Sequence, residues 1–338
     1  METIKLTQNV KSSGCSAKMP IKRLHEALTG YSKDMVDEKL LVGFDDNDDA
    51  LVYDLGDKVM VQSLDFFPPM VDDPYTFGAI TAANAISDIY AMNAKPSIAM
   101  NLICFPSCYS PSVMRAILDG AKDKAKEAGV VIAGGHTISD SEIKFGLSVT
   151  GFCSKDKFKT NSTCKLGHVL VLTKKLGHGA MITSKKGEFI SDEEFALAVN
   201  SMLKLNDNSP FENLELSALT DVTGFSLIGH SYEMAKASKV SIKIDSAKVN
   251  FFDSALNAAK FGFLPEGLYN NLEYFSSKIK VEREIEQPVF DILFSPETSG
   301  GLLICLDEND AKLLVEKNED YHIVGKVVPF DEKHVIIE

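Results

Sequence analysis

The spacing of apolar and polar positions along the chain predicts a mixture of strands and helices. Short runs rich in apolar and β-branched residues predict strands, and the clearest lie at 58–67, 98–105, 145–152, 169–173 and 302–306. Longer segments with apolar residues on one helical face predict helices, and these lie at 21–28, 74–92, 111–128, 191–205 and about 226–236. The chain is therefore expected to fold as a mixed α and β protein.

Residues 154–168 are polar and basic and interrupt this pattern, so we expect a domain boundary there. A chain of 338 residues is long enough for two domains, each with its own core. The predicted division is a flexible arm at 1–20, a first domain at 21–155 and a second at 156–338. The arm is expected to be mobile because no periodic apolar pattern holds it down.

Composition narrows the class of protein. Hydrophobic content of 45% and charged content of 25% are typical of a globular domain. The sequence shows no apolar run long enough to span a bilayer and no signal-peptide pattern at its start, which predicts a cytoplasmic protein with no membrane partner. A formal charge of −13 argues against nucleic acid as a partner, because such binding depends on neutralising phosphates. ATP is not excluded, since a bound metal inverts the local electrostatics.

The six cysteines are scattered along the chain, so we expect no disulfide framework. Cys104 and Cys108 lie close together, but no second pair has the spacing of zinc ligands.

Residues 45–88 concentrate carboxylates on three separate elements. An acidic turn at 45–49 precedes a strand that ends near Asp65, and the helix that begins near Pro74 carries Thr81, Asn84 and Asp88 on one face. Carboxylates without histidine suit a hard cation such as Mg²⁺. Solvated loop residues and helix caps are the competing interpretation. An EF-hand loop is excluded because its glycine and glutamate positions hold Ala50 and Gly56.

Three further motifs each have two interpretations. Asp221 lies just before a predicted helix, where it could cap that helix or supply a metal ligand from the second domain. Gly134-Gly135-His136-Thr137 follows an apolar strand as a phosphate-facing turn or a plain tight turn. The segment 296–301 could likewise face a phosphate or form a simple loop. No P-loop and no G-x-G-x-x-G motif is present, so bound ATP would depend on metal bridges from aspartates.

Within the predicted arm, Cys15 stands three residues before Lys18 among small residues. The thiol could be a nucleophile or ligand-capturing group favoured by the nearby ammonium, or an inert cysteine.

Taken together in this order, the motifs closely resemble the selenophosphate synthetase (selenide, water dikinase) family. The matching segments cover nearly the whole chain, and they are Gly14-Cys15 with Lys18, 48–50, 64–69, 71–74, 84–88, 133–137, 220–225 and 298–303. Ser16 and Ala17 replace a glycine and a second cysteine that many members carry, which puts a two-thiol role in doubt, and Ser226 replaces a glycine.

The resemblance implies the fold of aminoimidazole ribonucleotide synthetase, with an N-terminal α/β domain and a C-terminal α+β domain. Two chains would pair through their N-terminal sheets into a β-barrel, giving a homodimer with ATP near the interface. The implied reaction converts ATP, selenide and water to selenophosphate, AMP and orthophosphate, which supplies activated selenium for selenocysteine and selenonucleosides. A requirement for a monovalent cation such as K⁺ and a selenium-delivery protein remain open.

The resemblance also implies residue roles. Cys15 would handle selenium, Lys18 would contact the nucleotide phosphates, and Mg²⁺ would be held by Asp49, Asp88 and Asp221. The ATP site would be lined by Lys18, Asp46, Asn47, Asp48, Asp65, Asp88, Gly135, His136 and Thr137.

Two alternatives compete with this assignment. Another ATP-dependent enzyme of the superfamily, such as aminoimidazole ribonucleotide synthetase or thiamine-phosphate kinase, should not need Cys15 with Lys18 in a flexible arm. A non-catalytic nucleotide-binding regulator on the same scaffold should not need to retain the acids and Lys18.

Overall fold

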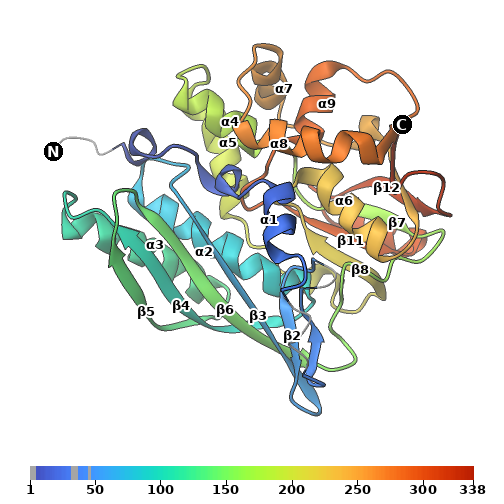
Figure 1. The fold of residues 1–338 in the computed structure, drawn as a ribbon, viewed down its shortest axis with the longest axis horizontal. Coiled ribbons are helices and arrows are strands. Elements are labelled where there is room, and N and C mark those ends of the chain that lie inside the picture. The colour runs from blue at the N-terminus through green and yellow to red at the C-terminus, as the bar shows by residue number, and fades with distance from the viewer. Residues whose placement is uncertain (1–4, 32–36, 45–46) are drawn as a thin grey trace.

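The computed structural model describes residues 5–31, 37–44 and 47–338, which form two sheets side by side with helices packed on them (Figure 1). The first sheet has the order β1-β2-β3-β6-β4-β5. Its strands are β1 (Leu40–Val42), β2 (Leu51–Asp54), β3 (Lys58–Phe67), β4 (Lys95–Phe105), β5 (Val131–Ser139) and β6 (Lys144–Ser154). The helices of this half are α1 (Ile21–Leu28), α2 (Pro74–Ala91) and α3 (Pro111–Glu127).

The second sheet has the order β10-β13-β9-β12-β7-β11-β8. Its strands are β7 (Val169–Leu172), β8 (Leu216–Asp221), β9 (Ser241–Ile244), β10 (Ile279–Val281), β11 (Leu302–Leu306), β12 (His322–Val328) and β13 (Val335–Ile337). Around it lie α4 (His178–Lys186), α5 (Asp192–Leu203), α6 (Ser226–Ala237), α7 (Asp253–Lys260), α8 (Glu266–Phe275), α9 (Gln287–Phe294) and α10 (Glu308–Glu316). None of the helices in the described ranges is long and apolar enough to cross a membrane.

Helix α2 connects the two halves. It starts where Asp73 accepts a hydrogen bond from the Thr76 amide and where Pro74 occupies the first turn. Every residue from Phe77 to Ala91 is buried, because α2 packs on β3, β4 and β6, against α3, and also against α5 and β8 of the second half. The face predicted to carry Thr81, Asn84 and Asp88 is therefore enclosed between the halves.

Several predicted boundaries agree with the structure, and the capping box of Ser191 and Glu194 is present at the start of α5. Asp221 does not cap α6, which begins at Ser226 and has no side-chain cap from Phe225. Instead, Asp221 is the last residue of β8. Of its two interpretations, helix capping is wrong.

Two expectations about the first sheet are corrected. The predicted turn at Gly134–Thr137 lies inside β5, which pairs in parallel with β4 and accommodates one extra residue at an irregularity opposite Ala99 and Asn101. Strand β4 is longer than predicted and only partly buried, because Ile98 and Met100 are exposed.

Large apolar side chains of β3, β4 and β5 are exposed on the face of the first sheet opposite α2. We call this the outer apolar face, and its large exposed side chains are Leu64, Phe66, Ile98, Met100, Val131 and Ile138. Isolated apolar side chains are ordinary on a protein surface, but a contiguous patch indicates an interaction site.

The N-terminal segment 5–18 lies across both halves. Thr7 bonds to Asp72 of the first half, while Lys186 of α4 donates to the Val10 carbonyl at 3.0 Å. This is one packed arrangement of the arm, and its flexibility stays a prediction.

Candidate active site

Three carboxylates from distant parts of the chain meet where α2 touches β8. Asp49 precedes β2, Asp88 lies on α2, and Asp221 ends β8. Each offers a carboxylate oxygen, and these atoms all lie within 4.8 Å of one another. The structure therefore brings together the three residues that the resemblance assigns to Mg²⁺.

The electrostatics of this carboxylate cluster are unfavourable without a cation. Burial raises the pKa of Asp49, and the charge of Asp221 raises it further. Burial likewise raises the pKa of Asp88, with a further increase from the charge of Asp65. Burial also raises the pKa of Asp221. Among the residues that the structure describes, Asp49 Oδ2 is buried without a hydrogen-bond partner. Oxygen-only ligands with an unsatisfied buried atom fit a hard divalent cation.

Hydroxyl groups orient each carboxylate of the cluster. Ser63 donates to Asp88 Oδ2, Ser87 donates to Asp221 Oδ2 at 2.6 Å, and Thr220 donates to Asp49 Oδ1 at 3.1 Å. Hydrogen bonds to the ionised form favour it, and such partners fix the direction of a ligand. Sequence reasoning missed these three hydroxyl donors, although Ser87 and Thr220 directly precede two of the predicted ligands.

Cys15 lies close to the cluster, 1% exposed. Its backbone amide donates to Thr298 Oγ1 at 3.1 Å, and its thiol lies 3.6 Å from Asn84 Oδ1. Burial raises the pKa of the Cys15 thiol to about 12, against the opposing effect of Lys18. In this arrangement the thiol is protonated.

Gly14 permits this close contact. It has a φ of 53°, which favours glycine. A Cβ atom at this position would lie 2.4 Å from Thr298 Oγ1, so any side chain would force the two segments apart.

Lys18 supplies positive charge beside the carboxylates. Burial alone would lower the pKa of its ammonium, but Asp65, Asp88 and Asp221 raise it above the ordinary value. The lysine is therefore a cation at any physiological pH. Its Cδ atom lies 2.7 Å from the place where a Cβ of Gly224 would be, so glycine leaves room for this side chain.

Asp65 on β3 extends the site toward the surface. Asn84 donates to Asp65 Oδ2 at 2.7 Å, which connects this carboxylate to the same amide that contacts Cys15. A cavity of about 670 Å³ opens beside Asp65 and Lys18, and its wall includes Lys11, Phe66 and Lys144. This volume suits a small-molecule ligand.

Of the remaining predicted residues, Asn47 and Asp48 directly precede Asp49, and the charge of Asp48 adds to the effect of burial and Asp221 in raising the pKa of Asp49. Asp48 faces the segment between the sheets, accepting from the Asn161 amide at 3.3 Å, and Asn161 also donates to the Asn47 carbonyl. Asp46 lies outside the described residues.

Gly135, His136 and Thr137 are exposed on the edge strand β5. Gly135 lies at the same level across the sheet as Asp65, but their strands, β5 and β3, are separated by β4 and β6. At normal strand spacing, β3 and β5 are roughly 14 Å apart. The structure does not bring these three residues to the carboxylate cluster of the same chain.

Comparison with known proteins defines the family. The pattern described as AIR synthase related protein, N-terminal domain, matches residues 47–153, and that of the C-terminal domain matches residues 165–338. The selenide, water dikinase of Clostridium botulinum (strain Alaska E43 / Type E3) is 49% identical over 100% of this chain and 99% of its own length. The selenide, water dikinase of Clostridioides difficile (strain 630) is 43% identical, covering 99% of each chain.

The chain belongs to the selenide, water dikinase family. The family and the AIR synthase-like fold that the sequence predicted are thereby confirmed. Membership identifies the chain as an enzyme of the kinase type.

Solved structures show the same fold more widely. Thiamine monophosphate kinase from Aquifex aeolicus superposes with a TM-score of 0.67 at 16% identity, covering 95% of this chain and 98% of that one. Hydrogenase maturation protein HypE in complex with ATP gives 0.63 at 17% identity, with 96% and 92% covered. At this identity the likeness concerns the fold alone, and the selenide, water dikinase relatives carry the functional comparison.

Proposed function

We propose that this protein makes selenophosphate from ATP, selenide and water, releasing AMP and orthophosphate. The observation that carries the proposal is the gathering of Cys15, Lys18 and the carboxylates of Asp49, Asp88 and Asp221 at one site. Phosphoryl transfer needs positioning and charge neutralisation more than covalent chemistry, and this site supplies both.

Asp49, Asp88 and Asp221 would hold Mg²⁺, which when bound neutralises charge on the phosphates of ATP. Lys18 would contact the same phosphates, since its ammonium faces the acids that would hold the metal. Asp65 and the 670 Å³ cavity beside it would receive more of the nucleotide. Asp46, Asn47, Asp48, Gly135, His136 and Thr137 remain proposed ATP contacts.

Cys15 would handle selenium, but its protonated and buried thiol must first become accessible. The short segment around Gly14 and Lys18 is the part that can move without disturbing a sheet. We therefore retain the proposal that residues 1–20 form a flexible catalytic arm, followed by an ATP-binding domain at 21–155 and a second domain at 156–338.

The outer apolar face supports the proposal of a homodimer in which two first sheets form a barrel. Such pairing would cover the exposed side chains of β3 and β4 and bring Gly135, His136 and Thr137 of one subunit to the site of the other. The monovalent cation, the selenium-delivery protein and the cytoplasmic location stay predictions.

Phosphorus NMR of the protein incubated with Mg-ATP and selenide tests the reaction directly. A selenophosphate resonance with equal amounts of AMP and orthophosphate is the expected result, and its absence would contradict the proposal. The Cys15→Ser variant should still bind ATP but lose selenide-dependent formation of AMP.

The same assay separates the two alternatives. Another enzyme of the superfamily would use ATP with its own acceptor, such as thiamine monophosphate, and turnover would not depend on selenide or Cys15. A non-catalytic regulator would bind ATP without producing AMP under any of these conditions.

A further inference from the structure

Ser299 adopts a backbone conformation that serine rarely takes. Its φ is 48°, in the left-handed region, where a residue with a Cβ atom is strained. Such strain persists only when the surroundings hold it, and it concentrates at functional sites. Ser299 directly follows Thr298, which accepts the hydrogen bond from the Cys15 amide.

Every polar group of Ser299 has a partner. Its amide donates to Asn84 Oδ1 at 2.9 Å, and its hydroxyl donates to the Met202 carbonyl at 2.7 Å. Its carbonyl accepts from Lys174 Nζ at 3.0 Å. Because Asn84 Oδ1 also faces the Cys15 thiol, the conformation of Ser299 bears directly on the position of Cys15.

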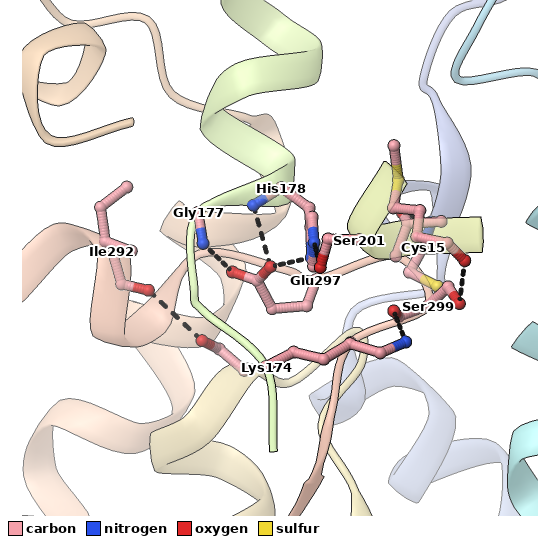
Figure 2. A network of polar contacts seen from close by, with 12 residues as sticks. Cys15, Lys174, Gly177, His178, Ser201, Ile292, Glu297 and Ser299 are labelled. Carbon is pink, nitrogen blue, oxygen red and sulfur yellow. Dashed lines mark hydrogen bonds and ion pairs between the residues drawn. The ribbon is translucent and has the colours of Figure 1, made fainter. Parts of the chain in front are cut away.

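Lys174 has an unusual environment for a lysine. The residue is 6% exposed, and its ammonium nitrogen donates to two backbone carbonyls, those of Ser299 and Lys204. Within the described ranges Lys174 forms no ion pair; burial lowers its pKa, and the charge of Asp221 opposes this from beyond ion-pair distance. Figure 2 shows the Lys174 side chain extending toward Ser299 beside Cys15. Burying a lysine without a carboxylate partner lowers the stability of the fold. Lys174 is therefore expected to have a role other than stabilisation.

A second set of contacts holds Glu297, at the start of the segment 297–299 that ends with Ser299. Glu297 is fully buried, and its carboxylate accepts from the amides of Gly177 and His178 at 2.8 and 2.9 Å (Figure 2). His178 Nδ1 lies 2.6 Å from Glu297 Oε2. The turn 297–299 is thus held from α4 on one side and by Lys174 on the other.

We propose that Lys174 is a positioning residue for Cys15. By bonding to the Ser299 carbonyl, it stabilises the left-handed conformation that directs Thr298 and the Ser299 amide toward Cys15 and Asn84. The inference rests on the proposed function only in taking Cys15 as the residue that handles selenium.

The test measures the position of Cys15 without using catalysis. Lys174→Met removes the ammonium but keeps the length and apolar stem of the side chain. Peptide mass spectrometry follows alkylation of Cys15 by iodoacetamide, with the exposed Cys108 as an internal reference. We expect Cys15 alkylation to accelerate about tenfold relative to Cys108, the factor that corresponds to one ordinary hydrogen bond.

A matched pair of second substitutions separates positioning from general loosening. Ser299→Gly and Ser299→Ala both lose the hydroxyl bond to Met202, but only glycine adopts a φ of 48° without a Cβ penalty. Lys174→Met/Ser299→Gly should therefore return Cys15 alkylation toward the rate of Ser299→Gly alone. Lys174→Met/Ser299→Ala should remain fast.

Three results would overturn the proposal. The first is an unchanged Cys15 rate in Lys174→Met, and the second is equal acceleration of Cys15 and of the buried Cys305, which indicates unfolding. The third is equal behaviour of the glycine and alanine double variants.

The rate of selenophosphate formation provides a separate measurement. If wild-type protein makes selenophosphate, Lys174→Met should lower kcat with little change in the KM for ATP. If it makes none, the proposed function fails while the alkylation comparison still decides the role of Lys174.

Discussion

Ser87 donates its hydroxyl hydrogen to Asp221 Oδ2 at 2.6 Å, a bond that joins α2 of the first half to β8 of the second. It also accepts a hydrogen bond from Asn206 Nδ2 at 2.8 Å. The adjacent residue Asp88 belongs to the carboxylate cluster. Ligands from both halves are therefore held together by a bond next to the site itself.

We expect Ser87→Ala to weaken Mg²⁺ binding about tenfold, since loss of a group that orients a ligand costs this much. The hydroxyl also lowers the pKa of Asp221, so its removal disfavours the ionised ligand. Isothermal titration with Mg²⁺ measures the change. Thr81→Ala is the control, because that buried hydroxyl of α2 donates to the Phe77 carbonyl. Equal affinities for the two variants would contradict the expectation.

Asp49→Asn should stabilise the metal-free protein and remove its response to Mg²⁺. The substitution relieves repulsion within a buried set of acids and deletes one ligand. We expect the Tm without metal to rise by about 2 °C, and the Mg²⁺-dependent increase seen with wild type to disappear. Asp54→Asn is a suitable control because Asp54 pairs with Lys155 at 2.6 Å instead. A Mg²⁺-dependent increase in Asp49→Asn as large as in wild type would exclude Asp49 as a ligand.

Gly14→Ala should displace Cys15 from its buried position. Alanine at a φ of 53° is strained, and its Cβ would overlap Thr298 Oγ1. Alkylation of Cys15 should become faster, and the free energy of unfolding should fall by about 1–2 kcal/mol. Gly129→Ala controls for strain alone, because Gly129 has a φ of 72° with no atom near its Cβ position. Faster Cys15 alkylation in both variants would indicate that strain, not the contact with Thr298, is responsible.

Lys174 should make stability depend on pH in the alkaline range. Burial lowers its pKa from 10.5 to about 7 in the folded protein. Between these values the unfolded chain binds more protons than the folded one, so the free energy of unfolding should rise with pH. The maximum contribution is about 1.4 kcal/mol per pH unit. Urea unfolding of wild type and Lys174→Met at pH 7, 8.5 and 10 checks this, and a constant difference between them would refute it.

Met100→Glu should disrupt the proposed dimer. A charge in the middle of the outer apolar face is costly to bury between two sheets. Size-exclusion chromatography with light scattering should give the mass of a dimer for wild type and of a monomer for the variant. Leu313→Glu on α10 replaces an equally exposed side chain in the other half and should leave the mass unchanged. A monomeric wild type would reject the dimer.

Local rules predicted what depends on local spacing. The start of α2 at Pro74 and the shared face of Asn84 and Asp88 follow from capping and helical periodicity, and both are present. The proximity of Asp88 and Asp221, in contrast, joins residues far apart in the sequence and does not follow from local spacing. It arises from packing between α2 and β8. The sequence indicated it only as one of two interpretations of Asp221 and through the family resemblance.

Other features left little trace in the sequence. Gly134 and Gly135 predicted a turn because paired glycines are common there, but pairing with β4 placed them within a strand. Ser226 replaces a glycine that is usual in the family, and its φ is 62°, a left-handed conformation that favours glycine at this position. The conformation of Ser299 was equally invisible, since nothing in a loop sequence reports the sign of φ.

The segment between β6 and β7 has a consequence for how substrates enter and leave. Adjacent residues within it bond to different halves, because the Lys159 amide donates to the Met92 carbonyl and the Thr160 carbonyl accepts from the Leu219 amide. A hinge rotation that parted the two sheets would break these bonds together with the bond between Ser87 and Asp221. Nucleotide exchange by displacement of the short N-terminal segment leaves all three intact, so the catalytic cycle can run with the two halves acting as one rigid frame.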